Sequence, residues 1–159
     1  MSRNNRFSTL DSFLDFLGNS LNWKFNREEF DDRFLLQKYV FFAQKFGLDS
    51  DYSYNVYVFG AYSRELAQDY YSEELSQQTN ADDLSDSFRS EEFVDLVRNR
   101  NARWLEIAST LTLYYDRFQN LDAEKQRSTS LEKTMQDKNA TRNTVEAIER
   151  SLSDRNLLQ

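Results

Sequence analysis

Adjacent carboxylates are the groups of this chain with the clearest capacity for chemistry. Paired acids hold metal ions in two-metal nucleases and act as acid and base in glycosidases. Neighbours in sequence point in different directions, however, and each pair here falls at a predicted helix start or in an acidic loop, where capping and solubility account for it. We therefore expect none of them to be catalytic. The pairs are Glu28/Glu29, Asp31/Asp32, Glu73/Glu74, Asp82/Asp83 and Glu91/Glu92.

A second oxygen-rich segment imitates the opening of a calcium-binding loop. Such a loop also needs a glycine at its sixth position and a glutamate that binds through both oxygens at its twelfth. The chain has Tyr54 and Gly60 at those positions. A turn before a strand is the better interpretation, and we expect no metal site. The alternating oxygen ligands would have been Asp49, Asp51, Ser53 and Asn55.

Composition removes much of the remaining catalytic chemistry. The chain has no cysteine and no histidine, so thiolate nucleophiles, the commonest general base and the commonest zinc ligands are excluded. Three glycines in 159 residues leave no glycine-rich phosphate loop. We therefore expect a protein that is not an enzyme and binds no cofactor.

The formal net charge of −7 is unevenly distributed along the chain. Residues 1–122 carry 13 Lys and Arg against 21 Asp and Glu, and residues 123–159 carry 7 against 6. An acidic body repels phosphate backbones, so nonspecific nucleic-acid binding is disfavoured. The longest uninterrupted apolar stretch is only Tyr39–Ala43, and residues 1–10 lack a signal-peptide pattern. We expect a cytoplasmic protein that does not enter membranes.

The absence of proline favours long helices. Apolar residues recur at helical spacing in most of the chain, and aromatics make up 15% of it, so we expect a core rich in Phe and Tyr. Asn26 and Glu29 have the spacing of a capping box, and Ser63 can cap a later helix. Residues 72–90 read as a mobile acidic connection. The predicted helices are 9–18, 27–46, 64–71, 90–99, 101–118, 123–137 and 141–155.

The predicted helix 27–46 has two aromatic stripes. Its main core face is predicted to consist of Leu35, Tyr39, Phe42 and Phe46, with Gln37, Lys38, Gln44 and Lys45 opposite. The second stripe, which lies among polar residues, is either covered by the first helix, the interpretation we favour, or an exposed ridge that binds a partner. It consists of Phe30, Phe34 and Phe41.

Large apolar and polar residues alternate from Tyr52 to Phe59, before Gly60, and predict one short strand or extended segment. Near the other end, the helix pair 123–137 and 141–155 has the outline of a helix-turn-helix, with Arg142, Asn143 and Arg150 available to DNA. An amphipathic helix packing on the body or on a partner is the interpretation that we favour there. The same helical pair could support a homodimer.

Two segments carry a family resemblance. Leu36–Gln44 and Tyr57–Leu66 together resemble the prokaryotic YwgA-like proteins and, more distantly, the Panacea or SocA-like antitoxin domain. Trp104–Tyr115 and Val145–Leu158 look like the later core helix and closing helix of those families. The resemblance implies a helical domain with a small β element and winged-helix-like character. Panacea domains neutralise partner toxins by direct binding, and neither family implies an enzyme.

The sequence therefore predicts a mostly α, compact helical domain with one short β element, winged-helix-like, spanning residues 1–159. Within it, residues 1–122 form an acidic helical body and residues 123–159 a C-terminal helical pair. We expect a protein-interaction or regulatory module, antitoxin-like or of mobile-element origin, with another protein as its partner. A winged-helix DNA-binding regulator of a plasmid or virus is the alternative. The predicted partner-binding residues are Phe30, Phe34, Phe41, Gly60, Tyr62 and Arg64.

Overall fold

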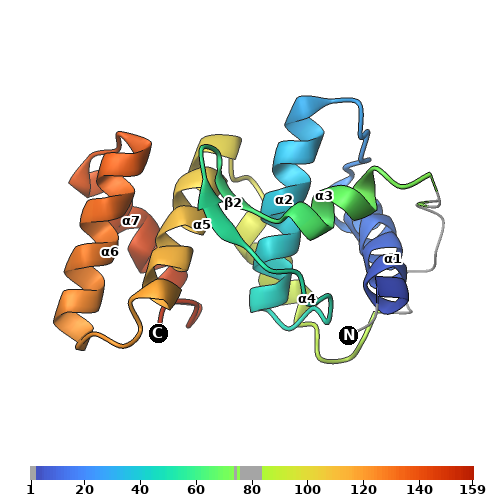
Figure 1. Ribbon diagram of the computed structural model, residues 1–159. Helices are drawn as coiled ribbons and strands as arrows, with labels where there is room; N and C mark the ends of the chain where they lie inside the picture. The colour runs from blue at the N-terminus through green and yellow to red at the C-terminus, as the bar shows by residue number, and fades with distance from the viewer. Residues whose placement is uncertain (1–2, 74, 76–83) are drawn as a thin grey trace. The chain divides into compact units, whose positions relative to one another are not determined.

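The computed structural model describes residues 3–73, 75 and 84–159, and within these the chain is mostly helical with one two-stranded antiparallel sheet (Figure 1). The prediction of a mostly α domain with a small β element is thereby confirmed. Much of the predicted acidic connection 72–90 lies outside the described residues. No helix in the described part is both long and apolar enough to cross a membrane.

The chain divides into two compact units. The N-terminal unit comprises residues 1–54 and 62–99, and the C-terminal unit comprises residues 55–61 and 100–159. The predicted division at residue 122 falls inside the C-terminal unit. The N-terminal unit contains α1 (Arg3–Leu21), α2 (Phe30–Lys45), α3 (Arg64–Tyr70) and α4 (Ser90–Val97); the C-terminal unit contains α5 (Ala102–Arg117), α6 (Ala123–Lys138) and α7 (Arg142–Ser153).

The N-terminal unit is built around aromatic rings. Phe93 of α4 is fully buried, and its ring centroid lies 5.6 Å from that of Phe13, 5.7 Å from Phe88 and 6.4 Å from Tyr39. The Phe13 and Tyr39 rings meet it edge to face, the arrangement that the aromatic quadrupole favours. The prediction of a Phe- and Tyr-rich core is confirmed for this unit.

Helix α1 is longer than the predicted 9–18 segment and does not end at Gly18. It continues to Leu21, and Asn22 then adopts a left-handed conformation with φ of 52°. Asparagine tolerates this conformation at the end of a helix, so Asn22 provides the stop that the sequence analysis assigned to glycine.

The start of α2 also differs from the prediction. The Asn26 side chain accepts a hydrogen bond from the Glu28 N–H, and the Asn26 N–H donates to the Asp32 carboxylate at 2.8 Å. Glu29 is the N-cap residue and its side chain makes no capping hydrogen bond. The predicted capping box is therefore wrong, because Asp32 takes the role expected of Glu29.

Two residues predicted on the polar side of α2 are buried. Gln37 is 2% exposed and exchanges two hydrogen bonds with the backbone of Ser63, at 3.0 and 2.8 Å. Lys38 is 1% exposed, and its ammonium lies 4.4 Å from the centroid of the Phe34 ring. The Gln37 amide thus ties α2 to the N-cap of α3, where the Ser63 hydroxyl accepts from Leu66 N–H as predicted.

Side-chain caps define the three helices of the C-terminal unit, which pack on one another. Asn101, Asp122 and Thr141 each accept a hydrogen bond from the backbone N–H three residues later. Asn139, with φ of 49°, ends α6 and separates it from α7. The predicted segments 101–118, 123–137 and 141–155 are confirmed to within two residues, because each carries its own cap in the sequence.

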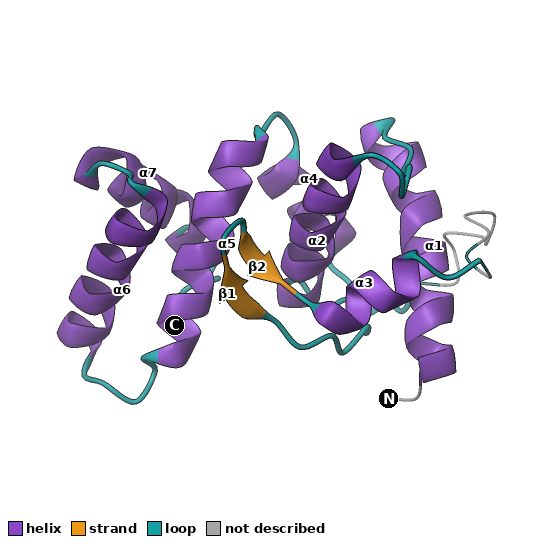
Figure 2. Cartoon of the chain, turned by 45° about the horizontal axis from the view of Figure 1, so that its top comes forward, coloured by secondary structure: helices purple, strands orange, loops and turns teal. Residues whose placement is uncertain are grey.

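A β-hairpin replaces the single predicted strand. It consists of β1 (Asn55–Tyr57) and β2 (Gly60–Tyr62), with Val58 and Phe59 in the turn. Gly60 has φ of 90°, which suits the left-handed third position of such a turn. Figure 2 shows the hairpin beside α5, and the Ala61 N–H donates to the Ser109 hydroxyl at 3.2 Å. Tyr52 and Tyr54, predicted as strand residues, precede the hairpin.

Candidate functional site

Large apolar side chains exposed to solvent are concentrated on two surfaces. Among the described residues, six large hydrophobic side chains are exposed, and five of them fall in these two places. The first, which we call the hairpin tip, consists of Tyr57, Val58 and Phe59. The second, the aromatic patch, consists of Phe30 and Tyr71 with half-buried Phe34. Leu121 lies outside both. Concentrated apolar exposure of this kind is typical of a surface that binds a partner.

The hairpin tip is the most exposed apolar segment in the part of the chain that the structure describes. Tyr57 is 41% exposed, Val58 79% and Phe59 50%. Turns usually contain Gly, Asn, Asp or Pro, because these residues suit turn backbones and solvent. The turn of this hairpin instead places Val58 and Phe59 before Gly60 and so departs from the usual turn composition.

The buried side chain of Lys138 binds the main chain of the hairpin tip. The Lys138 ammonium donates to the carbonyl oxygens of Val58 at 2.7 Å and Tyr57 at 3.4 Å, and it pairs with the Glu106 carboxylate at 3.2 Å. The Lys138 side chain is only 3% exposed. Arg103 in turn donates to the Lys138 carbonyl. Lys138 therefore positions the tip through its main-chain oxygens, while the side chains of Tyr57, Val58 and Phe59 are exposed.

The aromatic patch is organised by arginines. The Arg33 guanidinium lies 5.9 Å from the Phe30 ring and 5.9 Å from the Tyr71 ring, and it donates to the Arg27 carbonyl at 2.7 Å. Arg27 donates to the carbonyls of Tyr71 and Ser72, both at 3.0 Å. These bonds join the start of α2 to the end of α3 and bring together aromatic residues that are distant in sequence.

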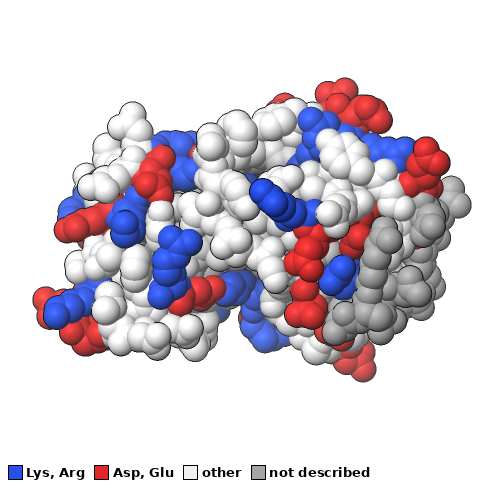
Figure 3. All heavy atoms as spheres, viewed as in Figure 1, with Lys and Arg blue, Asp and Glu red and all other residues white. Residues whose placement is uncertain are grey.

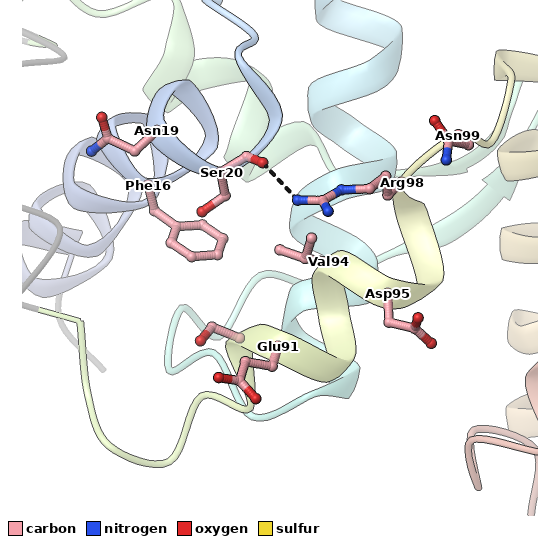
Figure 4. Close-up of a pocket in the computed structure, with 9 residues that line it drawn as sticks. Phe16, Asn19, Ser20, Glu91, Val94, Asp95, Arg98 and Asn99 are labelled. Atoms are coloured by element: carbon pink, nitrogen blue, oxygen red, sulfur yellow. Dashed lines mark hydrogen bonds between the residues drawn. The ribbon is translucent and has the colours of Figure 1, made fainter.

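A pocket of about 610 Å³ lies within the N-terminal unit between the end of α1 and α4 (Figure 4). The Phe16 ring and Val94 face each other across it, and Arg98 donates to the Ser20 carbonyl at 3.1 Å. In Figure 4 the carboxylates of Glu91 and Asp95 point away from Arg98 and from each other. The pocket can accept hydrogen-bonding groups, but these side chains do not converge on one reacting atom. Its lining is Phe16, Asn19, Ser20, Ser90, Glu91, Val94, Asp95, Arg98 and Asn99.

The predicted partner-binding residues do not form one continuous ridge. Phe41 is 3% exposed, and its ring lies 5.2 Å from that of Tyr54, so the segment before the hairpin covers it. Gly60 is buried and serves the turn. Phe30 and Arg64 are exposed. Phe34 and Tyr62 are half-buried. Of the predicted stripe, only Phe30 and Phe34 belong to an exposed surface.

The residues of the DNA-binding alternative are accessible. Arg142, Asn143 and Arg150 are all exposed on α7, which follows a three-residue connection from α6. Figure 3 shows Lys and Arg side chains interspersed with Asp and Glu on the visible face rather than gathered in one basic area. Arg127 on α6 is committed to Glu149 at 2.7 Å and Glu146 at 3.3 Å.

Two of the carboxylate pairs lie in the first turns of helices, where their charge complements the helix dipole. Asp31 and Asp32 occupy the first turn of α2, and Glu91 and Glu92 that of α4. Glu74, Asp82 and Asp83 are outside the described residues. Asp51 has φ of 57° and lies in the irregular segment before β1. Within the described ranges, no group of three or more acidic side chains is arranged to hold a metal ion.

The groups whose pKa is shifted by the fold are mostly buried tyrosines. Burial, followed by a hydrogen bond to Asp137, raises the pKa of Tyr114 to about 12. Burial also raises the pKa of Tyr115, which donates to the Glu149 carboxylate at 2.9 Å. Hydrogen bonds to Glu149 raise the pKa of Arg127. These groups are neutral tyrosines and a permanently charged arginine at physiological pH, so they stabilise the fold rather than exchange protons.

Sequence reasoning missed Lys138, Glu106 and Tyr71. Lys138 looks like an ordinary basic residue in the last turn of a helix, where it would complement the helix dipole. Tyr71 looks like the end of a capped helix. The one local signal was the pair Val58 and Phe59 directly before Gly60, since an apolar pair beside a turn glycine is unusual.

Comparison with known proteins found no matching family model, no similar curated protein and no similar solved structure. The resemblance to YwgA-like and Panacea proteins therefore remains a prediction from two short motifs.

Proposed function

We propose that this chain is a non-enzymatic protein-binding module whose hairpin tip inserts into an apolar recess on a partner protein. The observation behind this proposal is the exposed Tyr57-Val58-Phe59 segment held by buried Lys138. An apolar tip that is fixed before binding loses little conformational entropy on docking, so more of its burial contributes to affinity. The antitoxin-like role suggested by the family resemblance is compatible with such a module.

The free-energy cost of burying the Lys138 ammonium supports the proposal. We call Lys138, with Glu106 and Arg103 beside it, the anchor of the tip. Burying an ammonium is unfavourable unless a carboxylate and hydrogen-bond acceptors surround it, and Lys138 needs Glu106 and two carbonyls to meet that requirement. An apolar side chain could fill the same space without this requirement. The lysine can instead hold main-chain oxygens at a defined place, which is what a docking hairpin needs.

An affinity capture from the native host tests the proposal. Tagged wild-type protein, Val58→Asp and Leu121→Asp are compared by quantitative mass spectrometry, with nuclease present throughout. A charge at position 58 opposes burial of the tip, so one stoichiometric partner should be lost from Val58→Asp and retained by Leu121→Asp. Equal recovery of every protein by Val58→Asp and wild type would contradict a role for the tip.

A DNA-binding regulator is the second candidate because Arg142, Asn143 and Arg150 are exposed on the helix that follows the α6–α7 turn. If this function is correct, DNA binding should weaken steeply with salt and be lost when the three residues are replaced by alanine. Lys133→Ala on α6 is the control, since Lys133 is also exposed. DNA binding that the triple variant retains would exclude α7 as the reading helix.

A further inference from the structure

The two exposed surfaces differ in the charge that surrounds them. Four carboxylates flank Phe30 at the start of α2, and they are only partly offset by Arg27 and Arg33. Glu28, Glu29 and Asp31 are exposed, and Asp32 is half-buried. The aromatic patch is therefore an apolar surface with an acidic rim.

The base of the hairpin tip carries an excess of one positive charge, because Arg103 and Lys138 both pair with Glu106, at 3.7 and 3.2 Å. Its anchor contains Arg103, Glu106 and Lys138, whose side chains are 49%, 15% and 3% exposed. Arg103 is thus the member of the anchor most accessible to a partner. The hairpin tip is an apolar projection with a guanidinium near its base.

We propose that a second copy of this chain occupies these surfaces, with the hairpin tip of one copy docked on the aromatic patch of the next. Val58 and Phe59 would pack against the rings of Phe30 and Tyr71, and Arg103 would face the acidic rim. Aromatic and aliphatic contact supplies the burial, and the opposite charges set the orientation. This inference rests on the proposed role of the tip and names the recess that receives it.

Such a contact joins two different surfaces of the chain, so it can close as a pair, in which each copy docks its tip on the other copy's patch, or continue from copy to copy. Each copy has one tip and one patch, and a copy that uses its tip still offers its patch to another copy. The contact is also small, which predicts weak assembly that increases with concentration. We therefore expect the average mass to rise gradually with protein concentration.

Light scattering coupled to size-exclusion chromatography tests this, using the full chain from about 1 µM to about 1 mM, the range in which weak contacts associate. Wild-type mass should rise with concentration above the 19.0 kDa of one chain. Val58→Asp blocks the tip and the double variant Phe30→Ser/Tyr71→Ser blocks the patch, so each alone should stay monomeric. Leu121→Asp should behave as wild type.

Mixing the two blocked variants gives the sharper result. The intact tip of one can dock only on the intact patch of the other, so an equal mixture should reach twice the mass of one chain and stop there, and high salt should weaken it. A wild-type monomer at every concentration would overturn the inference, as would a mixture that stays monomeric or assembly that survives loss of the patch. Loss of a different captured protein on Val58→Asp, with wild type monomeric, would uphold the proposed function and overturn only this inference.

Discussion

The N-terminal and C-terminal units bury their interiors with different chemistry. Rings of Phe13, Phe88 and Phe93 interlock in the first. In the second, aliphatic side chains such as Leu111 and Ile148 are buried, and the unit also contains the Lys138–Glu106 ion pair and a tyrosine, Tyr115, hydrogen-bonded to Glu149. Aromatic packing tolerates many orientations, whereas an ion pair fixes its partners at defined distances. The N-terminal unit has buried polar contacts too, such as that of Gln37 with Ser63, but the exposed hairpin tip is held by the Lys138 ammonium of the C-terminal unit.

The largest expected loss of stability comes from a change in the aromatic core of the N-terminal unit. Phe93→Ala removes the ring at the centre of the N-terminal core and should lower the free energy of unfolding by about 4 kcal/mol. Trp23 reports on this unit, because its ring lies 5.2 Å from that of Tyr39. Urea unfolding of a Trp104→Phe background, followed by Trp23 fluorescence, measures the loss. A decrease below about 1.5 kcal/mol would mean that the core refills the space.

The corresponding change in the C-terminal unit is Lys138→Met. It leaves the half-buried Glu106 carboxylate without its ammonium and frees the Val58 and Tyr57 carbonyls, so we expect a loss of about 3 kcal/mol. Denaturant unfolding followed by Trp104 fluorescence in a Trp23→Phe background measures it. Lys133→Met, an exposed lysine on the same helix, should change stability by less than about 0.5 kcal/mol. Equal effects of the two substitutions would contradict an anchoring role.

Alkaline pH should lower the stability of the C-terminal unit through deprotonation of Tyr114. Its pKa in the folded protein is about 12, above the ordinary value of 10.0, so the unfolded chain loses the phenolic proton first. The stability from neutral Tyr114 is therefore complete below pH 10 and is lost as the pH rises from 10 to about 12. Denaturant unfolding across this range should show a shallower decline in Tyr114→Phe. An identical decline in both proteins would contradict the prediction.

A smaller effect distinguishes the helix starts of the two units. Thr141 caps α7 through its hydroxyl, whereas Glu29 precedes α2 without a capping side-chain bond. Thr141→Ala should cost about 1 kcal/mol, and Glu29→Ala less than about 0.5 kcal/mol. Thermal unfolding of the two variants compares them directly. A larger loss from Glu29→Ala would show that its charge at the helix start outweighs a hydrogen-bonded cap.

The same contrast explains what could be predicted from sequence. The helices of the C-terminal unit were predictable because their N-caps are Asn101, Asp122 and Thr141. These are residue types that mark a helix start whatever the surrounding fold. The burial of Lys38 and Lys138 was not, since it depends on groups 4 to 81 residues away that surround each ammonium. The aromatic patch was half predictable, through Phe30 and Phe34. Tyr71 joins it only because Arg27 and Arg33 bring the end of α3 to the start of α2.

The hairpin was misread for a similar reason. Tyr52 and Tyr54 continue the alternation of β1, so one longer strand fitted the pattern better than two short ones. Tyr52 instead donates from its hydroxyl to buried Asp69 at 2.6 Å in the N-terminal unit. Because of this contact, Tyr52 packs within the N-terminal unit instead of pairing in the sheet, and β1 begins only at Asn55.

Hydrogen–deuterium exchange at low and high protein concentration tests the central claim most directly, that the anchored tip is a docking element and the aromatic patch receives it. The account predicts slower exchange at high concentration in residues 55–62 and in the segments around Phe30 and Tyr71, with α6 and α7 unchanged away from Lys138. Val58→Asp should remove the whole effect. Slower exchange confined to α7, or the same exchange at both concentrations, would contradict the account.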